Sequence, residues 1–280
     1  MRTVAYFPLQ CARNSVPVIN AVLDSLRVYG YTPEENSMNS DMAVIWSVLW
    51  HGRMAANRQV YEHYRAQGRP VIIIDVGALY RGHTWKIALN NITRDGYYGH
   101  TENLDQDRPR KLGISLAVPV FNRPEILIAA QHQHSLQVAN LPSIEAWIYK
   151  KIIELRAVTD RPIRVRPHPR STLNLKLLPS DIVLEEPSYL SNTYDSFDLH
   201  FDCHAVVNYN SGPGIQAAIS GTRPITDSSS LASPVAISIQ DIEKPYTVDR
   251  DNWLVEICHT EYTLSEIQQG AWLKRILSIL

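Results

Sequence analysis

The chain has 280 residues, of which 45% are hydrophobic and 20% charged, and its formal net charge is −1. This composition is typical of a globular protein with one large domain or two ordinary ones. The lack of a basic excess excludes nucleic-acid binding through overall charge, so any such contact needs a local patch.

The first 75 residues alternate between strand and helix signals. Ser15, Pro17 and Gly30 are start and stop signals of a helix, and VIIID at 71–75 is a β-branched run of the kind found in parallel sheets. This alternation predicts one half of a doubly wound α/β protein. Strands are expected at 2–7, 41–50 and 69–75, and helices at 15–30 and 54–68.

The alternation resumes after residues 76–122, which we interpret as long loops with short elements. Strands are expected at 123–131, 162–168, 181–186, 205–209 and 223–227, and helices at 143–160, 213–220 and 263–280. We predict an α/β fold of two Rossmann-like domains facing each other across a cleft. The domains are placed at 1–122 and 123–262, and a terminal helix at 263–280 is expected to pack back on the first domain.

The location of the protein is predicted to be cytoplasmic. The longest apolar run, AVIWSVLW at 43–50, is far shorter than the roughly 20 residues of a membrane span. The N-terminal residues lack the apolar segment and cleavage site of a signal peptide. Cys11, Cys203 and Cys258 show no paired spacing, which favours a reducing compartment.

The segment PIRVRPHPR, residues 162–170, ends a predicted strand on a histidine. Ligands of open α/β sheets bind beyond the carboxyl ends of the strands, where His168 is expected. Arg166 precedes it, and Pro167 and Pro169 restrict the backbone on both sides. A histidine that donates a hydrogen bond there could bind phosphate and stabilise charge on a leaving group. A solvent-facing loop histidine fits the same pattern.

A second strand end carries NSGPGIQAA, residues 210–218, at the start of a predicted helix. Ser211 is a natural helix cap, Gly212 lets a ligand approach the backbone, and Pro213 suits the first turn. The amides at such a helix start form an anion site. The next strand ends in TDSSS, residues 226–230, which adds hydroxyls at the same edge. The alternative is an ordinary capped helix followed by a serine-rich turn.

These motifs together resemble the donor half of GT-B glycosyltransferases, in the branch of bacterial capsule Kdo transferases and sialyltransferases. The resemblance covers roughly residues 123–235, from the strand before RVRPHPR to the end of the serine-rich turn. It implies a GT-B fold and a nucleotide sugar as the donor substrate, with no separate cofactor and no metal. It also implies donor contacts from Arg166, His168, Pro169, Asn210, Ser211, Gly212, Gly214, Ser228, Ser229 and Ser230.

We predict an inverting sugar transfer, with a retaining one left open, and inversion needs a base for the acceptor hydroxyl. Asp75 ends the run VIIID, where a parallel strand opens at the edge of the sheet, and burial there would raise the pKa of its carboxyl. Asp95 is the second candidate, and His83 and His100 are held in reserve. Asp75 could instead cap a turn or pair with Arg81.

The resemblance implies an acceptor that is either a saccharide or a hydroxymethylated pyrimidine in phage DNA, because short GT-B enzymes with the second activity exist. If a phage encodes the protein, its location is the host cytoplasm. A DNA acceptor would require a basic rim on the first domain. The basic residues available for such a rim are Arg81, Arg94, Arg108, Arg110 and Lys111.

Other activities remain open on the same fold. A nucleotide-sugar epimerase or hydrolase, or a non-catalytic nucleotide-sugar binder, would use the same donor residues. Two further segments contain pairs of histidines. QHQH, residues 131–134, lines the cleft or forms a plain polar loop. HFDCH, residues 200–204, lacks the second ligand pair of a zinc site.

Overall fold

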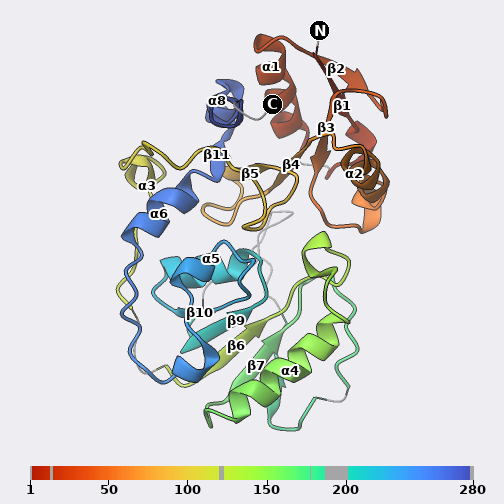
Figure 1. Cartoon of the computed structure of the whole chain (residues 1–280). Helices are drawn as coiled ribbons and strands as arrows, with labels where there is room; N and C mark the ends of the chain where they lie inside the picture. Colours follow the sequence, from red (N-terminus) through yellow and green to blue (C-terminus); the bar gives the residue numbers. More distant parts are fainter. Residues whose placement is uncertain (1, 13–14, 120–122, 177, 187–200, 278–280) are drawn as a thin grey trace. The chain divides into compact units, whose positions relative to one another are not determined.

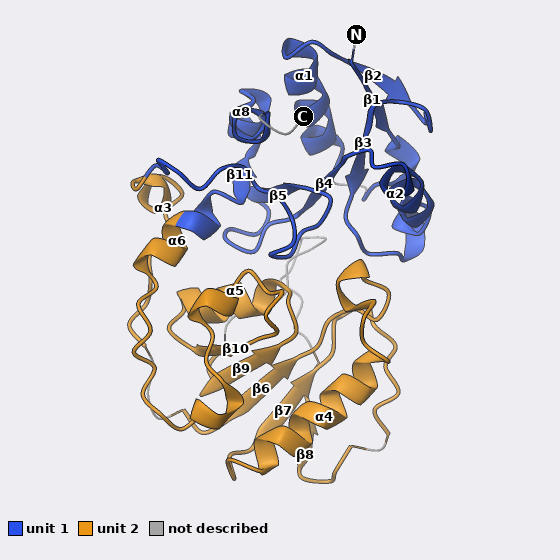
Figure 2. Ribbon diagram, viewed as in Figure 1, with its two compact units in different colours: residues 1–105, 256–280 blue, residues 106–255 orange. Residues whose placement is uncertain are grey.

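The computed structural model describes residues 2–12, 15–119, 123–176, 178–186 and 201–277. The chain divides into two compact units, the first formed by residues 1–105 and 256–280 and the second by residues 106–255 (Figure 2). Each unit contains its own sheet of mostly parallel strands with helices beside it (Figure 1). The α/β class and the two Rossmann-like domains predicted from the sequence are therefore confirmed.

Unit 1 is built on a six-stranded sheet in the order β11-β5-β4-β3-β1-β2. Strands β1 to β4 run parallel, whereas β5 is antiparallel to β4 and to β11. Residues 71–74 are buried on both faces, as the continuous apolar run predicts. The strands are β1 (Arg2–Tyr6), β2 (Tyr31–Glu35), β3 (Met42–Trp46), β4 (Val71–Val76), β5 (Thr84–Leu89) and β11 (Glu261–Thr263), and the main helices are α1 (Val16–Val28) and α2 (Asn57–Ala66).

Three strands of unit 1, β2, β5 and β11, are not predicted by the sequence. The β2 sequence YTPEE contains a proline and two glutamates, which an edge strand tolerates because one of its sides needs no backbone partner. Strand β5 lies in the region expected to be loops and forms an antiparallel pair with β4. A polar edge strand and a short hairpin therefore escape a search for buried parallel strands.

The terminal helix expected at 263–280 is instead a strand and two short helices, β11, α7 (Leu264–Gln268) and α8 (Ala271–Ile276). The break falls at Gly270, whose φ of 70° lies in the left-handed region that favours glycine. Trp272 on α8 is 1% exposed, and its Nε1 donates to Ser25 Oγ of α1 at 3.1 Å. The C-terminal segment is thus part of the unit 1 core.

We expect Trp272→Ala to lower the free energy of unfolding of unit 1 by about 3–5 kcal/mol, because it removes a fully buried aromatic side chain. Urea denaturation followed by circular dichroism measures the change. Lys274→Ala, on the exposed face of the same helix, is the control and should stay close to wild type. Equal stability of the two variants would contradict the packing described here.

Unit 2 contains a five-stranded parallel sheet in the order β10-β9-β6-β7-β8. Helix α4 begins after Ser143, whose hydroxyl accepts from Ala146 N, and α5 connects β9 to β10. The strands are β6 (Ile126–Ala129), β7 (Ile163–Arg166), β8 (Ile182–Leu184), β9 (Ala205–Asn208) and β10 (Arg223–Ile225). The helices are α3 (Arg108–Lys111), α4 (Ile144–Arg156), α5 (Gly212–Ile219) and α6 (Asp251–Cys258), the last of which spans the division between the units.

The division between the units differs from the predicted boundaries in two places. Residues 106–119 belong to unit 2, because Ala117 N donates to Ile219 O at 2.9 Å and Ala117 O accepts from Arg250 Nη2 at 2.8 Å. Residues 256–262 belong to unit 1, where β11 pairs with β5. Both assignments rest on long-range hydrogen bonds that the local sequence does not encode.

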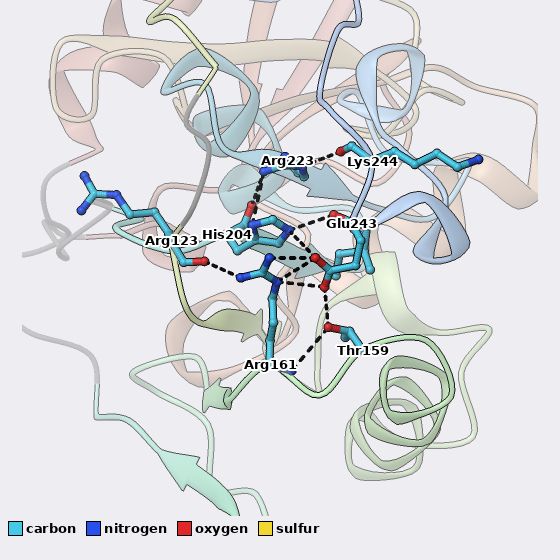
Figure 3. A network of polar contacts seen from close by, with 8 residues as sticks. Arg123, Thr159, Arg161, His204, Arg223, Glu243 and Lys244 are labelled. Carbon is cyan, nitrogen blue, oxygen red and sulfur yellow. Dashed lines mark hydrogen bonds and ion pairs between the residues drawn. The ribbon is translucent and has the colours of Figure 1, made fainter.

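A polar network occupies the amino ends of the unit 2 strands (Figure 3). Glu243 accepts hydrogen bonds from Arg161 and from the Thr159 hydroxyl, and these contacts, with Arg161 first, lower the pKa of the Glu243 carboxyl to about 2. Buried His204 donates from Nε2 to Ile242 O at 2.8 Å, which leaves its Nδ1 as an acceptor 3.4 Å from Arg223 Nη1. The network ties the connections before β7, β9 and β10 together.

The described part of the HFDCH segment, residues 201–204, contributes to this network. His204 and Cys203 are both buried, and Cys203 Sγ donates to Ala205 O at 3.4 Å. His200 lies outside the described residues. Across the described ranges, no three histidine, cysteine, aspartate or glutamate side chains group as a metal site requires. None of the helices in those ranges combines the length and apolar composition of a membrane span.

Stability is expected to fall in mild acid because of His204. Burial, with Arg223 and Arg161 nearby, lowers its pKa, so the folded protein binds a proton less readily than the unfolded chain. Its contribution is complete above the unfolded pKa of about 6.5 and is lost as the pH falls toward the lower folded value. Urea midpoints at pH 7.5 and 5.5 test this.

His204→Gln should show a smaller difference between these two midpoints, because the titrating group is gone. His134→Ala, which removes an exposed histidine, is the control and should keep the wild-type difference. A His204→Gln midpoint that falls as steeply as wild type would refute the assignment.

Candidate functional site

The chain order of the unit 2 sheet reverses between β6 and β9. Strands β7 and β8 follow on one side of β6, and β9 and β10 lie on the other. In open α/β sheets the ligand site lies beyond the carboxyl ends of the strands at such a reversal. The donor residues predicted from the sequence follow β7, β9 and β10, so they gather along this edge.

A reciprocal pair of hydrogen bonds bridges the reversal. Gln131 Oε1 accepts from Asn210 N at 2.8 Å, and Gln131 Nε2 donates to Asn210 Oδ1 at 2.9 Å. Gln131 is 4% exposed and Asn210 6%, so the pair is shielded from solvent. The sequence singles out the QHQH segment but not Gln131 itself, because nothing local indicates its partner 79 residues away.

The side chain of Asn210 is fully engaged with the protein. Its Nδ2 donates to Gln137 O at 3.2 Å and to Ser229 Oγ at 2.9 Å. Ser229 Oγ in turn donates to Asp227 Oδ1 at 2.6 Å. Asn210 therefore holds three strand-end segments together, and its predicted contact with a donor phosphate stays a prediction.

Two histidines follow the neighbouring strands β6 and β7 with the same local geometry. His132 Nδ1 accepts from His134 N at 3.1 Å, and His168 Nδ1 accepts from Arg170 N at 3.1 Å. These bonds place the proton of each neutral ring on Nε2. The His132 and His168 rings lie edge to face with centroids 5.2 Å apart. His168, flanked by half-buried Pro169, is thus held as an Nε2–H donor, as a phosphate contact requires.

Arg166 has its own partners inside unit 2. The residue is 7% exposed, its guanidinium lies over the Phe201 ring at 5.0 Å, and its Nη1 is 3.8 Å from Glu185 Oε1. These contacts anchor the guanidinium beside the sheet. The donor contact predicted for Arg166 remains a prediction.

The start of helix α5 is organised by Asn208. Its Nδ2 donates to Ser211 Oγ at 2.9 Å, and its Oδ1 accepts from Ser211 N at 2.9 Å. The Ser211 hydroxyl is thus turned back to the strand instead of capping the helix. Gly212 is half-buried at the first helical position, whereas Gly214 is buried. A Cβ at position 214 would lie only 2.9 Å from Thr226 Cγ2, so this position has no room for a side chain. Gly214 permits close packing, and Gly212 is the more accessible of the two.

The three serines after β10 differ in environment. Ser228 is exposed, and Ser229 is half-buried between Asn210 and Asp227. Ser230 is fully buried, and its Oγ accepts from Ala232 N at 3.1 Å. Ser230 therefore shapes the turn, whereas Ser228 and Ser229 lie where a ligand can reach. The sequence motif alone does not separate these roles.

In unit 1 the candidate base Asp75 stands near the end of β4. Its Oδ1 accepts from Val76 N at 2.7 Å, and its Oδ2 accepts from Ser47 Oγ at 3.3 Å. Burial raises the pKa of the Asp75 carboxyl, although Val76 N, Lys86, Ser47 and Arg81 oppose the shift. A carboxylate with a raised pKa is a better proton acceptor near neutral pH.

The other candidate bases have more exposed environments. Asp95 is exposed in a turn, where its backbone N donates to Thr93 Oγ1 at 3.3 Å. His100 is exposed with Nδ1 3.4 Å from Arg275 O, and exposed His83 stacks on Tyr80. Among these candidates, Asp75 is the half-buried one and lies near the end of a strand.

No protein-family model and no curated protein sequence matches the chain. Among solved structures, KpsC β-Kdo 2,7 transferase of Thermosulfurimonas dismutans matches with a TM-score of 0.51 at 10% identity, covering 99% of each chain. The chain has the fold of that transferase. The GT-B-like fold class and the resemblance to Kdo transferases are thereby confirmed at the level of the fold.

Two other matches are weaker. KpsC β-Kdo 2,4 transferase of the same organism has a TM-score of 0.48 at 10% identity and covers 96% of this chain and 98% of its own. The glycosyltransferase SnogD of Streptomyces nogalater has a TM-score of 0.27 at 10% identity and covers 98% of this chain and 96% of its own.

Asn210→Ala is expected to lower the free energy of unfolding by about 1–3 kcal/mol, because the buried Gln131 Nε2 loses its acceptor, Asn210 Oδ1, while Gln137 O and Ser229 Oγ lose the Asn210 Nδ2 donor. The midpoint of urea denaturation measures this loss. Ser228→Ala, an exposed position at the same edge, is the control and should match wild type. An Asn210→Ala variant as stable as the control would show that the bridge does not hold the edge together.

Proposed function

We propose that the protein is a glycosyltransferase that moves a sugar from a nucleotide sugar to an acceptor hydroxyl. The observation that carries the proposal is the strand-end edge at the reversal of the unit 2 sheet. There the His168 Nε2–H group, the start of α5 and the exposed Ser228 lie on the connections that follow β7, β9 and β10. The fold shared with the β-Kdo 2,7 transferase supports it.

The donor chemistry follows from these groups. The positive end of the α5 dipole and the His168 Nε2–H group attract the phosphates of the donor. In the transfer, the bond between the anomeric carbon and the phosphate oxygen breaks, and negative charge develops on the departing nucleotide. A fixed N–H donor stabilises that charge more than it stabilises the ground state. This accounts for the transfer without a metal ligand set.

Asp75 is our candidate for the base of an inverting reaction. Its carboxylate accepts the proton of the acceptor hydroxyl as that oxygen attacks the anomeric carbon. Because burial raises its pKa, the active carboxylate form is lost as the pH falls through this raised value. The rate should therefore decline on the acid side at a pH above that of an ordinary aspartate.

The acceptor we propose is a saccharide. A basic rim on unit 1 would keep only Arg81 and Arg94 of the residues named for it, because Arg108, Arg110 and Lys111 lie on α3 of unit 2. Arg108 is also buried, and Arg110 pairs with Asp107 at 2.5 Å. Without a row of phosphate contacts, duplex binding has little electrostatic support.

The function is tested by incubating the protein with CMP-, UDP- and GDP-sugars, with and without saccharide acceptors. Nucleotide release that depends on an acceptor identifies a transferase. Epimerised sugar without acceptor identifies an epimerase, and acceptor-independent release identifies a hydrolase. Thermal stabilisation without any turnover would identify a binder and overturn the proposal.

Two variants assign the roles in the same assay. His168→Ala should lower turnover about 10²–10³-fold and weaken nucleotide binding, since one charge-stabilising donor is lost. Asp75→Asn should abolish transfer while nucleotide binding stays at the wild-type level. Lys150→Ala, exposed on α4, is the control for both. Wild-type turnover in Asp75→Asn would remove Asp75 as the base and shift the assignment to Asp95.

A further inference from the structure

The connection between β4 and β5, residues 77–83, directly follows the strand that carries Asp75. Its first part is held by a carboxylate from the far end of the chain. Glu261 is fully buried, and its two oxygens accept from Ala78 N at 2.7 Å and from Leu79 N at 3.1 Å. Glu261 Oε2 also accepts from Thr84 Oγ1 at 2.8 Å. Three charge-assisted hydrogen bonds thus fix both ends of the connection.

The tip of the connection is a tight turn that exposes two aromatic rings. Tyr80 O accepts from His83 N and from Thr84 N, each at 2.9 Å. Gly82 has a φ of +80°, a conformation that favours glycine and closes the turn. The turn brings the His83 ring onto the Tyr80 ring, with centroids 4.1 Å apart and planes at 30°.

This stacked pair lies on the surface. Tyr80 is 52% exposed, one of few large apolar side chains of unit 1 with so much exposed area among the described residues, and His83 is exposed as well. Most exposed aromatic rings lose considerable side-chain freedom when they bind a ligand. Here the turn and the stacking fix the rings beforehand, so little freedom remains to be lost.

We propose that the Tyr80–His83 pair is the platform on which the acceptor saccharide packs the apolar face of a pyranose ring. This inference rests on the proposed transfer to a saccharide and deepens it. A pyranose presents C–H groups on one face and hydroxyl groups around its rim. An exposed aromatic ring can therefore pack on the C–H face while the hydroxyl groups stay free to react. Asp75 lies only five residues before Tyr80, at the other end of the anchored connection.

The charge of unit 1 favours a neutral ring over a nucleic acid. The sequence of residues 1–105 and 256–280 holds twelve lysines and arginines and twelve aspartates and glutamates. Base stacking on aromatic rings is common, but nucleic-acid sites pair such rings with a strongly basic groove. A unit with balanced charge therefore suits a saccharide better than a DNA strand.

Saturation-transfer NMR tests the platform with methyl pyranosides of glucose, galactose and mannose, and with a ten-base-pair DNA duplex as the competing ligand. We expect at least one pyranoside to receive saturation from the wild-type protein, most strongly at its ring C–H protons. Tyr80→Ala and His83→Ala should each weaken that binding about tenfold or more. Tyr80→Phe keeps the ring and should bind as wild type.

Val28→Ala, which shortens an 82% exposed side chain on α1, is the matched control and should leave pyranoside binding unchanged. Urea denaturation checks that every variant is folded. The inference is overturned if no pyranoside binds the wild type, if Tyr80→Ala binds as well as wild type, or if the duplex alone binds.

Nucleotide binding separates this inference from the proposed function. Thermal shift with CMP, UDP and GDP should be the same in Tyr80→Ala and in wild type, because the donor residues are untouched. A protein that binds nucleotide but no pyranoside overturns the platform alone. If the protein binds a pyranoside through Tyr80 but binds no nucleotide, the proposed transferase activity is overturned, whereas saccharide binding by the Tyr80–His83 pair is supported.

Discussion

The donor edge of unit 2 depends on the reciprocal hydrogen bonds between Gln131 and Asn210. They join the connections after β6 and β9, the two strands between which the sheet reverses its order. At such a reversal the connections on either side diverge and leave a crevice. The buried hydrogen bonds between Gln131 and Asn210 link the two connections without a charged group. Through Ser229 and Asp227 the same bonds fix the connection after β10, so the reachable groups sit on a rigid frame.

In unit 1 a carboxylate, that of Glu261, holds a connection in place where unit 2 uses an amide. Buried Glu261 accepts two backbone N–H groups and a hydroxyl, and the connection that follows Asp75 is thereby fixed. The two carboxylates illustrate how environment divides roles. Glu261 is saturated with donors and shapes the backbone, whereas Asp75 is less fully hydrogen-bonded and has a pKa raised by burial.

The polar residues of unit 2 divide between the two ends of its sheet. At the amino ends, Arg161 pairs with Glu243, and His204 donates to the adjacent Ile242 O, so these residues hold the connections in place (Figure 3). At the carboxyl ends, His168 is half-buried and Ser228 is exposed. The physical cause is the polarity of a parallel sheet, in which ligand-binding connections emerge at one edge and structural ones at the other.

The sequence by itself determined the α/β class, most of the parallel strands and the strand-end positions of Asp75 and His168, because apolar runs and Pro/Gly signals act locally. Only the tertiary structure decided which of the predicted residues have partners inside the protein. Asn210, Gly214 and Ser230 carry the same motif as their accessible neighbours but have their partners inside the protein. Those partners, like Glu261 for the connection after Asp75, come from distant parts of the chain, and long-range pairing leaves no local pattern to detect.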